Sequence, residues 1–290
     1  MGNLARMRES KRPSGSTEAY FRTDGPHAGP IVVVYHIQKT AGTSLRRVVR
    51  ANLPPVEVAI ERDLQKLRYK PRELLRWHDR WYGSLPPERR DRLACVMSHS
   101  AGFLLPALDR PAEALTVVRE PVDRVLSFYF YKRRRPGDPP VGNKAPFLDL
   151  DEIYALSDDE RAELGKPPRM ESWEQFSNWQ SRALLSVFHD VSELRFGAEL
   201  SPDADVWRDR LRALVGEIFT VGVQDDLPGF VGVLAQRYGW GETAVPQSKA
   251  NVHRSDDDVT TELRETIRAH NWLDQELYEL ARETQLAAAR

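Results

Sequence analysis

Short apolar runs alternate with longer amphipathic stretches along most of the chain. The run Ile31–Tyr35 is apolar at every position and largely β-branched, which is typical of a strand buried on both faces. Shorter runs over 93–97, 114–118 and 217–223 also predict strands. Helices are predicted over 45–51, 61–92, 121–131, 173–188, 206–214, 227–238 and 259–289, the last with a break near His270. This alternation predicts an α/β fold with a central, mainly parallel sheet flanked by helices.

The predicted sheet limits where a ligand is expected. In open parallel sheets, ligands bind beyond the carboxyl ends of the strands. That rule points to the residues that follow Tyr35, Met97 and Val118.

The charge balance and the cysteine count narrow the classes of function. With 42 Lys and Arg against 43 Asp and Glu, the net charge is −1, and the basic excess of a generic nucleic-acid binder is missing. The single cysteine, Cys95, excludes an intramolecular disulfide and a cysteine-based metal cluster. No run approaches the roughly 20 apolar residues of a membrane-spanning helix, and there is no secretory signal. We therefore expect a cytoplasmic protein with no transmembrane segment and no nucleic-acid partner.

A single domain is predicted behind an N-terminal arm. Residues 1–29 are polar and rich in Gly, Pro, Ser and charge, which predicts a flexible arm. The domain is therefore placed at 30–290. Within it, residues 132–170 are rich in turn-forming residues, and we expect a loop insertion there.

The segment that follows Tyr35 has the layout of an anion site. A buried strand leads into a loop with one lysine, Lys39, and one glycine, Gly42, and a helix is predicted to begin at Ser44. A helix N-terminus offers N–H donors and a positive dipole end, and the hydroxyls of Thr40, Thr43 and Ser44 add further donors. The spacing is not that of a Walker A loop (Gly-x-x-x-x-Gly-Lys-Ser/Thr), because here the lysine comes early and Gly42 follows it. The alternative is an ordinary strand–turn–helix with Ser44 as its N-cap.

A second candidate anion element follows Val118. Arg119 stands at a predicted strand end, where its guanidinium can meet a phosphate, and Ser127 lies about two turns into the next helix. The alternative is a plain helix start, in which Glu120 and Asp123 offset the helix dipole.

Together, the two elements resemble the sulfotransferases that use 3′-phosphoadenosine 5′-phosphosulfate (PAPS). Segment 36–44 (HIQKTAGTS) resembles the family's 5′-phosphosulfate loop, commonly HIPKTAGTS, and segment 118–129 (VREPVDRVLSFY) resembles its 3′-phosphate element. Segments 98–103 (SHSAGF) and 219–227 (FTVGVQDDL) resemble more loosely the carbohydrate branch, of which heparan sulfate 2-O-sulfotransferase is typical. The resemblance covers roughly residues 30–285.

The resemblance implies a fold and a reaction. The fold would be a three-layer, P-loop-NTPase-like domain, with residues 132–170 on the acceptor side. The reaction would move a sulfuryl group from PAPS to an acceptor hydroxyl, expected on a glycan or glycoside, by in-line displacement and without a metal. One departure is Gln38, where the family usually has proline; the anion donors are retained.

The resemblance also implies residue roles. Lys39 would contact the bridging oxygen of the donor and stabilise the departing 5′-phosphate, and Arg119 and Ser127 would hold the 3′-phosphate. The other residues expected at the donor are Thr40, Gly42, Thr43 and Ser44 at the 5′-phosphate, and Lys249, Asn251 and Arg254 closing the pocket.

His99 is the expected general base. It follows a predicted strand end, an imidazole titrates close to neutral pH, and the similar segment of the family supplies its base. The alternative is a structural or capping role for His99. His36 is a rival for which we expect a structural role, and an acidic residue of 138–175 could also serve as base.

Two other classes of function stay open. A kinase-like phosphotransferase on the same fold would need a magnesium-binding carboxylate and a Walker lysine, and the sequence offers neither at the expected spacing. The other alternative is a non-catalytic nucleotide-binding module on the same fold, and the presence of Lys39, Arg119, Ser127 and His99 speaks against it.

Overall fold

A computed structural model describes residues 29–53, 58–60, 81–133, 148–163, 173–187, 200, 205–245 and 259–288. Residues 1–28 of the predicted arm, residues 61–80 of the helix predicted over 61–92, and Lys249, Asn251 and Arg254 lie outside the described residues. The chain divides into two compact units. Unit 1 comprises residues 1–118, 213–248 and 281–290, and unit 2 comprises residues 119–212 and 249–280.

Unit 1 is built on a five-stranded parallel sheet in the order β2-β3-β1-β4-β5. The strands are β1 (Ile31–Tyr35), β2 (Val58–Ile60), β3 (Cys95–Ser98), β4 (Ala112–Val118) and β5 (Phe219–Val223). Every residue of the central strand β1 is buried, as the sequence predicts for a strand covered on both faces. The parallel α/β architecture is confirmed, whereas β2 has no counterpart among the predicted strands.

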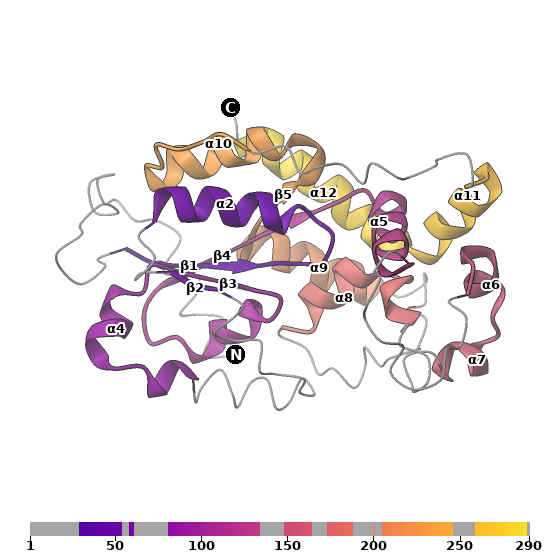
Figure 1. The fold of residues 1–290 in the computed structure, drawn as a ribbon, viewed down its shortest axis with the longest axis horizontal. Helices are drawn as coiled ribbons and strands as arrows, with labels where there is room; N and C mark the ends of the chain where they lie inside the picture. The colour runs from indigo at the N-terminus through magenta and orange to yellow at the C-terminus, as the bar shows by residue number, and fades with distance from the viewer. Residues whose placement is uncertain are drawn as a thin grey trace. The chain divides into compact units, whose positions relative to one another are not determined.

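Two helices of unit 1 lie side by side over one face of the sheet, α2 (Gly42–Asn52) and α10 (Leu227–Tyr238) (Figure 1). Val48 of α2 and Phe230 of α10 join Val34 of β1 in one buried apolar cluster. The opposite face is covered in part by a 3₁₀ helix, η4 (Ala101–Ala107), whose Phe103 meets Tyr35 edge to face at 6.3 Å between ring centroids. A further helix, α4 (Pro87–Arg92), precedes β3.

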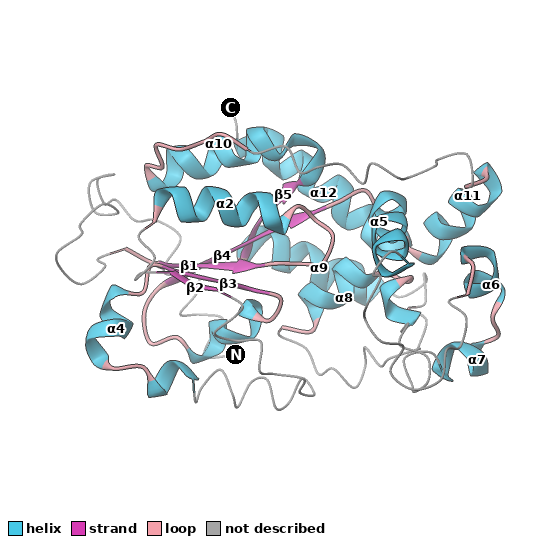
Figure 2. Ribbon diagram, in the orientation of Figure 1, coloured by secondary structure: helices cyan, strands magenta, loops and turns pink. Residues whose placement is uncertain are grey.

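Unit 2 is helical in its described part (Figure 2). Its helices are α5 (Pro121–Arg133), α6 (Leu150–Ala155), α7 (Asp158–Glu163), η5 (Trp173–Gln175), α8 (Trp179–Leu185), α11 (Thr261–His270), and the first parts of α9 (Asp205–Glu217) and α12 (Trp272–Ala288). Helices α5, α6 and α11 share a buried apolar cluster that includes Phe128, Ile153 and Ile267. None of the helices in the described part of the chain combines the length and the apolar character needed to cross a membrane.

Part of the segment predicted as a loop, 132–170, is helical. Helices α6 and α7 both begin with reciprocal capping contacts. The N–H of Asp149 donates to Glu152 at 2.8 Å, and the N–H of Ser157 donates to Glu160 at 2.9 Å. The D-x-x-E and S-x-x-E spacings are the sequence signal of such helix starts, and the composition-based loop prediction overlooked them.

Two other helix boundaries show how far the local sequence pattern predicts where a helix begins or ends. The predicted break near His270 is confirmed, because α11 ends at this residue and α12 begins at Trp272. The helix predicted over 173–188 is shorter: α8 begins only after Asn178, which has a left-handed backbone with φ 54°. Asn tolerates this conformation better than most residues and interrupts the helix there.

Candidate functional site

The loop between β1 and α2 is tightly folded. Lys39 (φ 70°) and Ala41 (φ 64°) both have a left-handed backbone, which costs roughly 1–2 kcal/mol for a non-glycine residue. The buried hydroxyl of Thr40 donates to the carbonyl of Ile37 at 2.9 Å and holds the turn between them. Backbone strain of this kind persists only where the surroundings impose it, and it concentrates at functional sites.

Helix α2 begins at Gly42, two residues before the predicted start at Ser44. The N–H groups of Ser44 and Leu45 donate to the carbonyl of Ala41 at 2.9 and 3.1 Å, so Ala41 is the N-cap and Ser44 lies in the first turn. The prediction of Ser44 as helix start or N-cap is therefore wrong. It failed because Ala41 turns the chain into the helix from a left-handed conformation that sequence does not show for alanine.

The N-terminus of α2 suits an anion. Its N-cap residue, Ala41, has no polar side chain to cap it, and its first turn carries no acidic residue. The positive end of the helix dipole is therefore not offset by a carboxylate of the helix itself, and the first N–H groups of a helix point out of its end. Thr43 is exposed there and Lys39 is half-buried, whereas the hydroxyl of Thr40 is used within the loop.

The register of the sheet brings two histidines together. Tyr35 and Ser98 are partners at the ends of β1 and β3, so His36 and His99 occupy the next position of neighbouring parallel strands. Their rings stack with centroids 4.2 Å apart and planes 25° apart. Both lie at the carboxyl edge of the sheet, beside the loop that carries Lys39.

A hydrogen bond defines the tautomer of His99. Its Nδ1 lies 2.5 Å from the carbonyl oxygen of His36, and a carbonyl only accepts. Nδ1 therefore carries the proton and donates it, which places the lone pair of the neutral imidazole on Nε2. That is the arrangement a general base needs.

His36 is held over the start of α2. A Cβ atom added to Gly42 would overlap the His36 ring, so the absence of a side chain at Gly42 makes room for this imidazole. Burial, and then the charges of His99, Arg46 and Lys39, lower the pKa of His36 from 6.5 to about 3. His36 is therefore neutral near pH 7, and its position fits a structural element of the site.

The second element begins unit 2. The side chain of Arg119 is 16% exposed, and its Nη2 lies 3.8 Å from the carboxylate of Asp123, which is 36% exposed. Glu120 accepts the N–H of Asp123 at 2.7 Å and so caps α5. The end of this helix is therefore occupied by the chain's own carboxylate, so the guanidinium of Arg119 is the group of this element that could bind an anion. Ser127 lies on α5 and is 4% exposed.

The structure thus groups the predicted residues in two sets. Lys39, the Gly42–Ser44 helix start and His99 lie together in unit 1, and Arg119 and Ser127 belong to unit 2. Sequence reasoning missed Gln180, whose buried carboxamide contacts the main chain of Arg119. The Ser-Asn pair just before α8 is the signal of a helix start that could have drawn attention to this segment.

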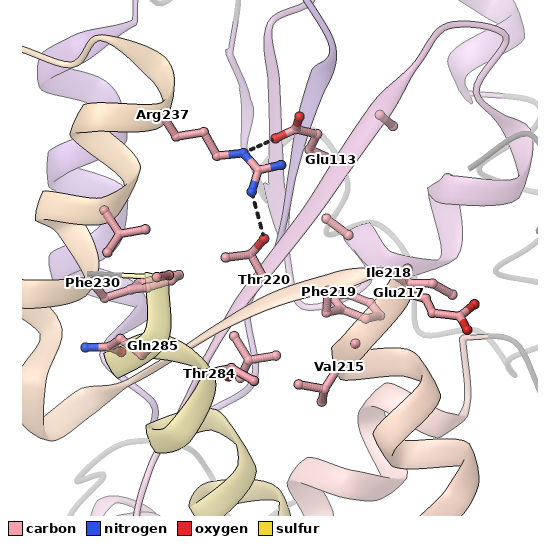
Figure 3. A pocket seen from close by; sticks show the side chains of 16 residues that line it. Glu113, Val215, Glu217, Ile218, Phe219, Thr220, Phe230, Arg237, Thr284 and Gln285 are labelled. Atoms are coloured by element: carbon pink, nitrogen blue, oxygen red, sulfur yellow. Dashed lines mark hydrogen bonds and ion pairs between the residues drawn. The ribbon is translucent and has the colours of Figure 1, made fainter. Parts of the chain in front are cut away.

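A cavity of about 380 Å³ lies elsewhere in unit 1 (Figure 3). It borders the beginnings of β4 and β5, where Glu113 pairs with Arg237 at 2.8 Å and accepts from Tyr238 at 2.7 Å. This is the end of the strands opposite to the loop of Lys39. Since ligands of parallel sheets bind at the carboxyl ends, the cavity is not part of the candidate site.

Comparisons with known proteins leave the family open. No protein-family model matches the chain, and a search of curated proteins finds no significant match. Among the described residues, no group of three or more His, Cys, Asp and Glu is arranged to hold a metal ion.

Proposed function

We propose that the protein is a PAPS-dependent sulfotransferase of a P-loop-like, three-layer fold that acts on an acceptor hydroxyl, with a glycan or glycoside as the expected acceptor. The observation that carries the proposal is the grouping of Lys39, the uncapped start of α2 and the Nδ1-protonated His99 at the carboxyl ends of β1 and β3. This grouping combines groups that can bind an anion with a candidate base. The identity of the sulfuryl donor, PAPS, is inferred from the sequence resemblance.

The chain's own residues divide the work of sulfuryl transfer. The donor supplies an activated sulfur–oxygen bond to a 5′-phosphate leaving group. His99 Nε2 takes the proton of the acceptor hydroxyl as that oxygen bonds to sulfur, and Lys39 stabilises the charge that develops on the leaving phosphate oxygen as the old bond breaks. The N–H groups at the start of α2 hold the same phosphate. Arg119 would hold the 3′-phosphate with its guanidinium, and Ser127 would add its hydroxyl as a further donor.

The first test is a thermal shift with the donor product, 3′-phosphoadenosine 5′-phosphate (PAP), against ADP and ATP–magnesium. A ligand at 100 times its dissociation constant adds about 2.7 kcal/mol to the free energy of unfolding, which is several degrees in Tm for a chain of this size. A shift with PAP that exceeds the shift with ADP supports the proposal. A shift with ATP–magnesium alone would support the kinase-like alternative, and no shift at all in folded protein would support neither enzyme.

Replacement of Lys39 by Ala separates catalysis from folding. We expect a large loss of PAPS turnover on a panel of glycosides, measured as PAP release, with Tm unchanged. Arg47→Ala is the matched control, because Arg47 is an exposed basic residue of α2, the helix that follows the loop of Lys39. An unaltered rate in Lys39→Ala would contradict the role given to this lysine.

A further inference from the structure

The main chain of Arg119 is held from both sides by one buried side chain. The N–H of Arg119 donates to Gln180 Oε1 at 2.8 Å, and Gln180 Nε2 donates to the carbonyl of Arg119 at 2.9 Å. The carboxamide thus pairs with Arg119 as a neighbouring strand would. Fixing both polar groups of one residue restricts the dihedral angles on either side of its Cα, and these angles set the direction in which its side chain leaves the backbone.

Gln180 is itself fixed by a buried carboxylate. Asp274 is 1% exposed, and its two oxygens accept the N–H of Gln180 at 3.1 Å and of Ser181 at 2.7 Å. Both N–H groups belong to the first turn of α8, so Asp274, a residue of α12, caps α8. Gln180 Nε2 also lies 3.4 Å from the same carboxylate, which orients the carboxamide towards Arg119.

The cap is reciprocal. Asn178, directly before α8, accepts the N–H of Leu273 at 2.8 Å and of Asp274 at 3.1 Å with its side-chain oxygen, and so caps α12. The N–H of Asn178 donates to the side chain of Asn271 at 2.8 Å. Each helix start is therefore held by a residue of the other. Buried polar networks that are this well paired are rigid and specify one arrangement.

The network ends at Arg119, whose guanidinium forms a long ion pair with Asp123. The 3.8 Å ion pair of Arg119 with Asp123 is long, and its carboxylate is 36% exposed, so we expect this pair to contribute little to stability. A phosphate can therefore replace Asp123 as the partner of the guanidinium. The rigidity therefore lies in the backbone behind Arg119.

We propose that Gln180 is a positioning residue for anion binding: anchored by Asp274 and Asn178, it fixes the backbone of Arg119 so that the guanidinium meets the 3′-phosphate of the donor without reorganisation. The inference rests on the proposed function, since it takes the ligand of Arg119 to be that phosphate. Pre-organised contacts bind more tightly because less freedom is lost on binding.

The test isolates the contribution of the 3′-phosphate. Calorimetric dissociation constants are measured for PAP and for adenosine 5′-monophosphate (AMP), which differ by that group alone. In Gln180→Met, which keeps the volume and removes both contacts to Arg119, we expect the PAP-over-AMP preference to fall at least about tenfold while the affinity for AMP is retained. Arg119→Ala should remove the preference, and adding Gln180→Met to it should cause no further loss.

The matched control is Gln285→Met. Gln285 is equally a buried glutamine with main-chain contacts, accepting from Val223 at 2.8 Å and donating to the carbonyl of Asp226 at 3.0 Å, but these lie at the end of β5 in unit 1. Gln285→Met should lower Tm about as much as Gln180→Met does and should leave the preference for PAP over AMP intact. Should Gln180→Met fail to fold, Gln180→Glu serves instead: its preference for PAP, relative to wild type at each pH, should recover on acidification as the carboxyl regains a donor.

The outcomes separate the two proposals. If the wild type binds PAP no better than AMP, the proposed function itself is wrong. If the wild type prefers PAP and Arg119→Ala does not, but Gln180→Met keeps the full preference, the positioning role is overturned. Equal loss of affinity for PAP and AMP in Gln180→Met would also overturn it, because that is the signature of general destabilisation.

Discussion

At the scale of single residues, the candidate site depends on a missing side chain. Gly42 is in the first turn of α2, where alanine is ordinarily preferred over glycine. The Cβ of an alanine at this position, however, would overlap the ring of His36. We expect Gly42→Ala to destabilise the protein by about 1–3 kcal/mol, the usual cost of forcing atoms into a packed region, and to weaken PAP binding. Urea unfolding and calorimetry measure the two effects.

Gly232 provides the control for this substitution. It is an exposed glycine inside α10, and a Cβ there meets nothing within 4 Å. Gly232→Ala should therefore stabilise the protein by about 0.5–1 kcal/mol through helix propensity alone. If both variants changed stability in the same direction, the packing of His36 on Gly42 would not be the reason for the glycine.

His36 gives the site a predicted pH dependence. Burial lowers its pKa to about 3, whereas the unfolded chain takes up the proton near 6.5. Below the unfolded value, the unfolded state binds more protons than the folded state, so stability is complete above pH 6.5 and falls as pH decreases towards 3. One such group contributes a slope of at most about 1.4 kcal/mol per pH unit.

The slope can be assigned by substitution. The free energy of unfolding in urea, measured between pH 7 and pH 5, should fall more steeply for the wild type than for His36→Gln, which has no imidazole to protonate. Parallel curves for the two proteins would show that His36 titrates alike in both states.

At the scale of elements, Asn178 at the junction of α8 and α12 is expected to contribute measurably to the stability of the protein. Asn178 supplies both a left-handed backbone with φ 54° and the side-chain oxygen that caps α12. Asn178→Ala loses both and should destabilise by about 2–3 kcal/mol, whereas Asn178→Gly loses only the cap and should cost about 1 kcal/mol less. Urea unfolding of the two variants measures the difference. Equal losses would mean that the backbone conformation at this residue carries no strain.

The elements also show that local features can be predicted from the sequence, whereas long-range contacts cannot. Helix α10 begins and ends where its pattern predicts, because apolar spacing, a Pro at the start and a Gly at the end are all local signals. The stack of His36 on His99 is not local, since it follows from the pairing of Tyr35 with Ser98 across 63 residues of chain. Gln180 was missed for the same reason: its partner Asp274 lies 94 residues away.

At the scale of the whole molecule, the division into two units shows a second limit of prediction from sequence. The change of composition near Ile31 predicts where an ordered domain begins, but it does not predict that the chain divides after Val118 or that residues 213–248 return to unit 1. Periodicity reports which positions are buried and not which segments share a core. β5 and α10 are correctly predicted as elements, yet their place beside β4 and over the sheet comes from long-range packing.

The last prediction concerns the whole protein and its ligand charges. The net charge is only −1, but the residues proposed to bind the donor include two cations, Lys39 in unit 1 and Arg119 in unit 2, in addition to the N-terminus of α2. Because these groups can neutralise the phosphates, we expect the thermal shift with PAP to be the same in EDTA as in magnesium. ATP, measured in parallel, should give no larger shift when magnesium is added. If the PAP shift disappeared in EDTA, or if ATP–magnesium stabilised the protein more than PAP, a metal-dependent phosphotransferase would account for the site better than a sulfotransferase.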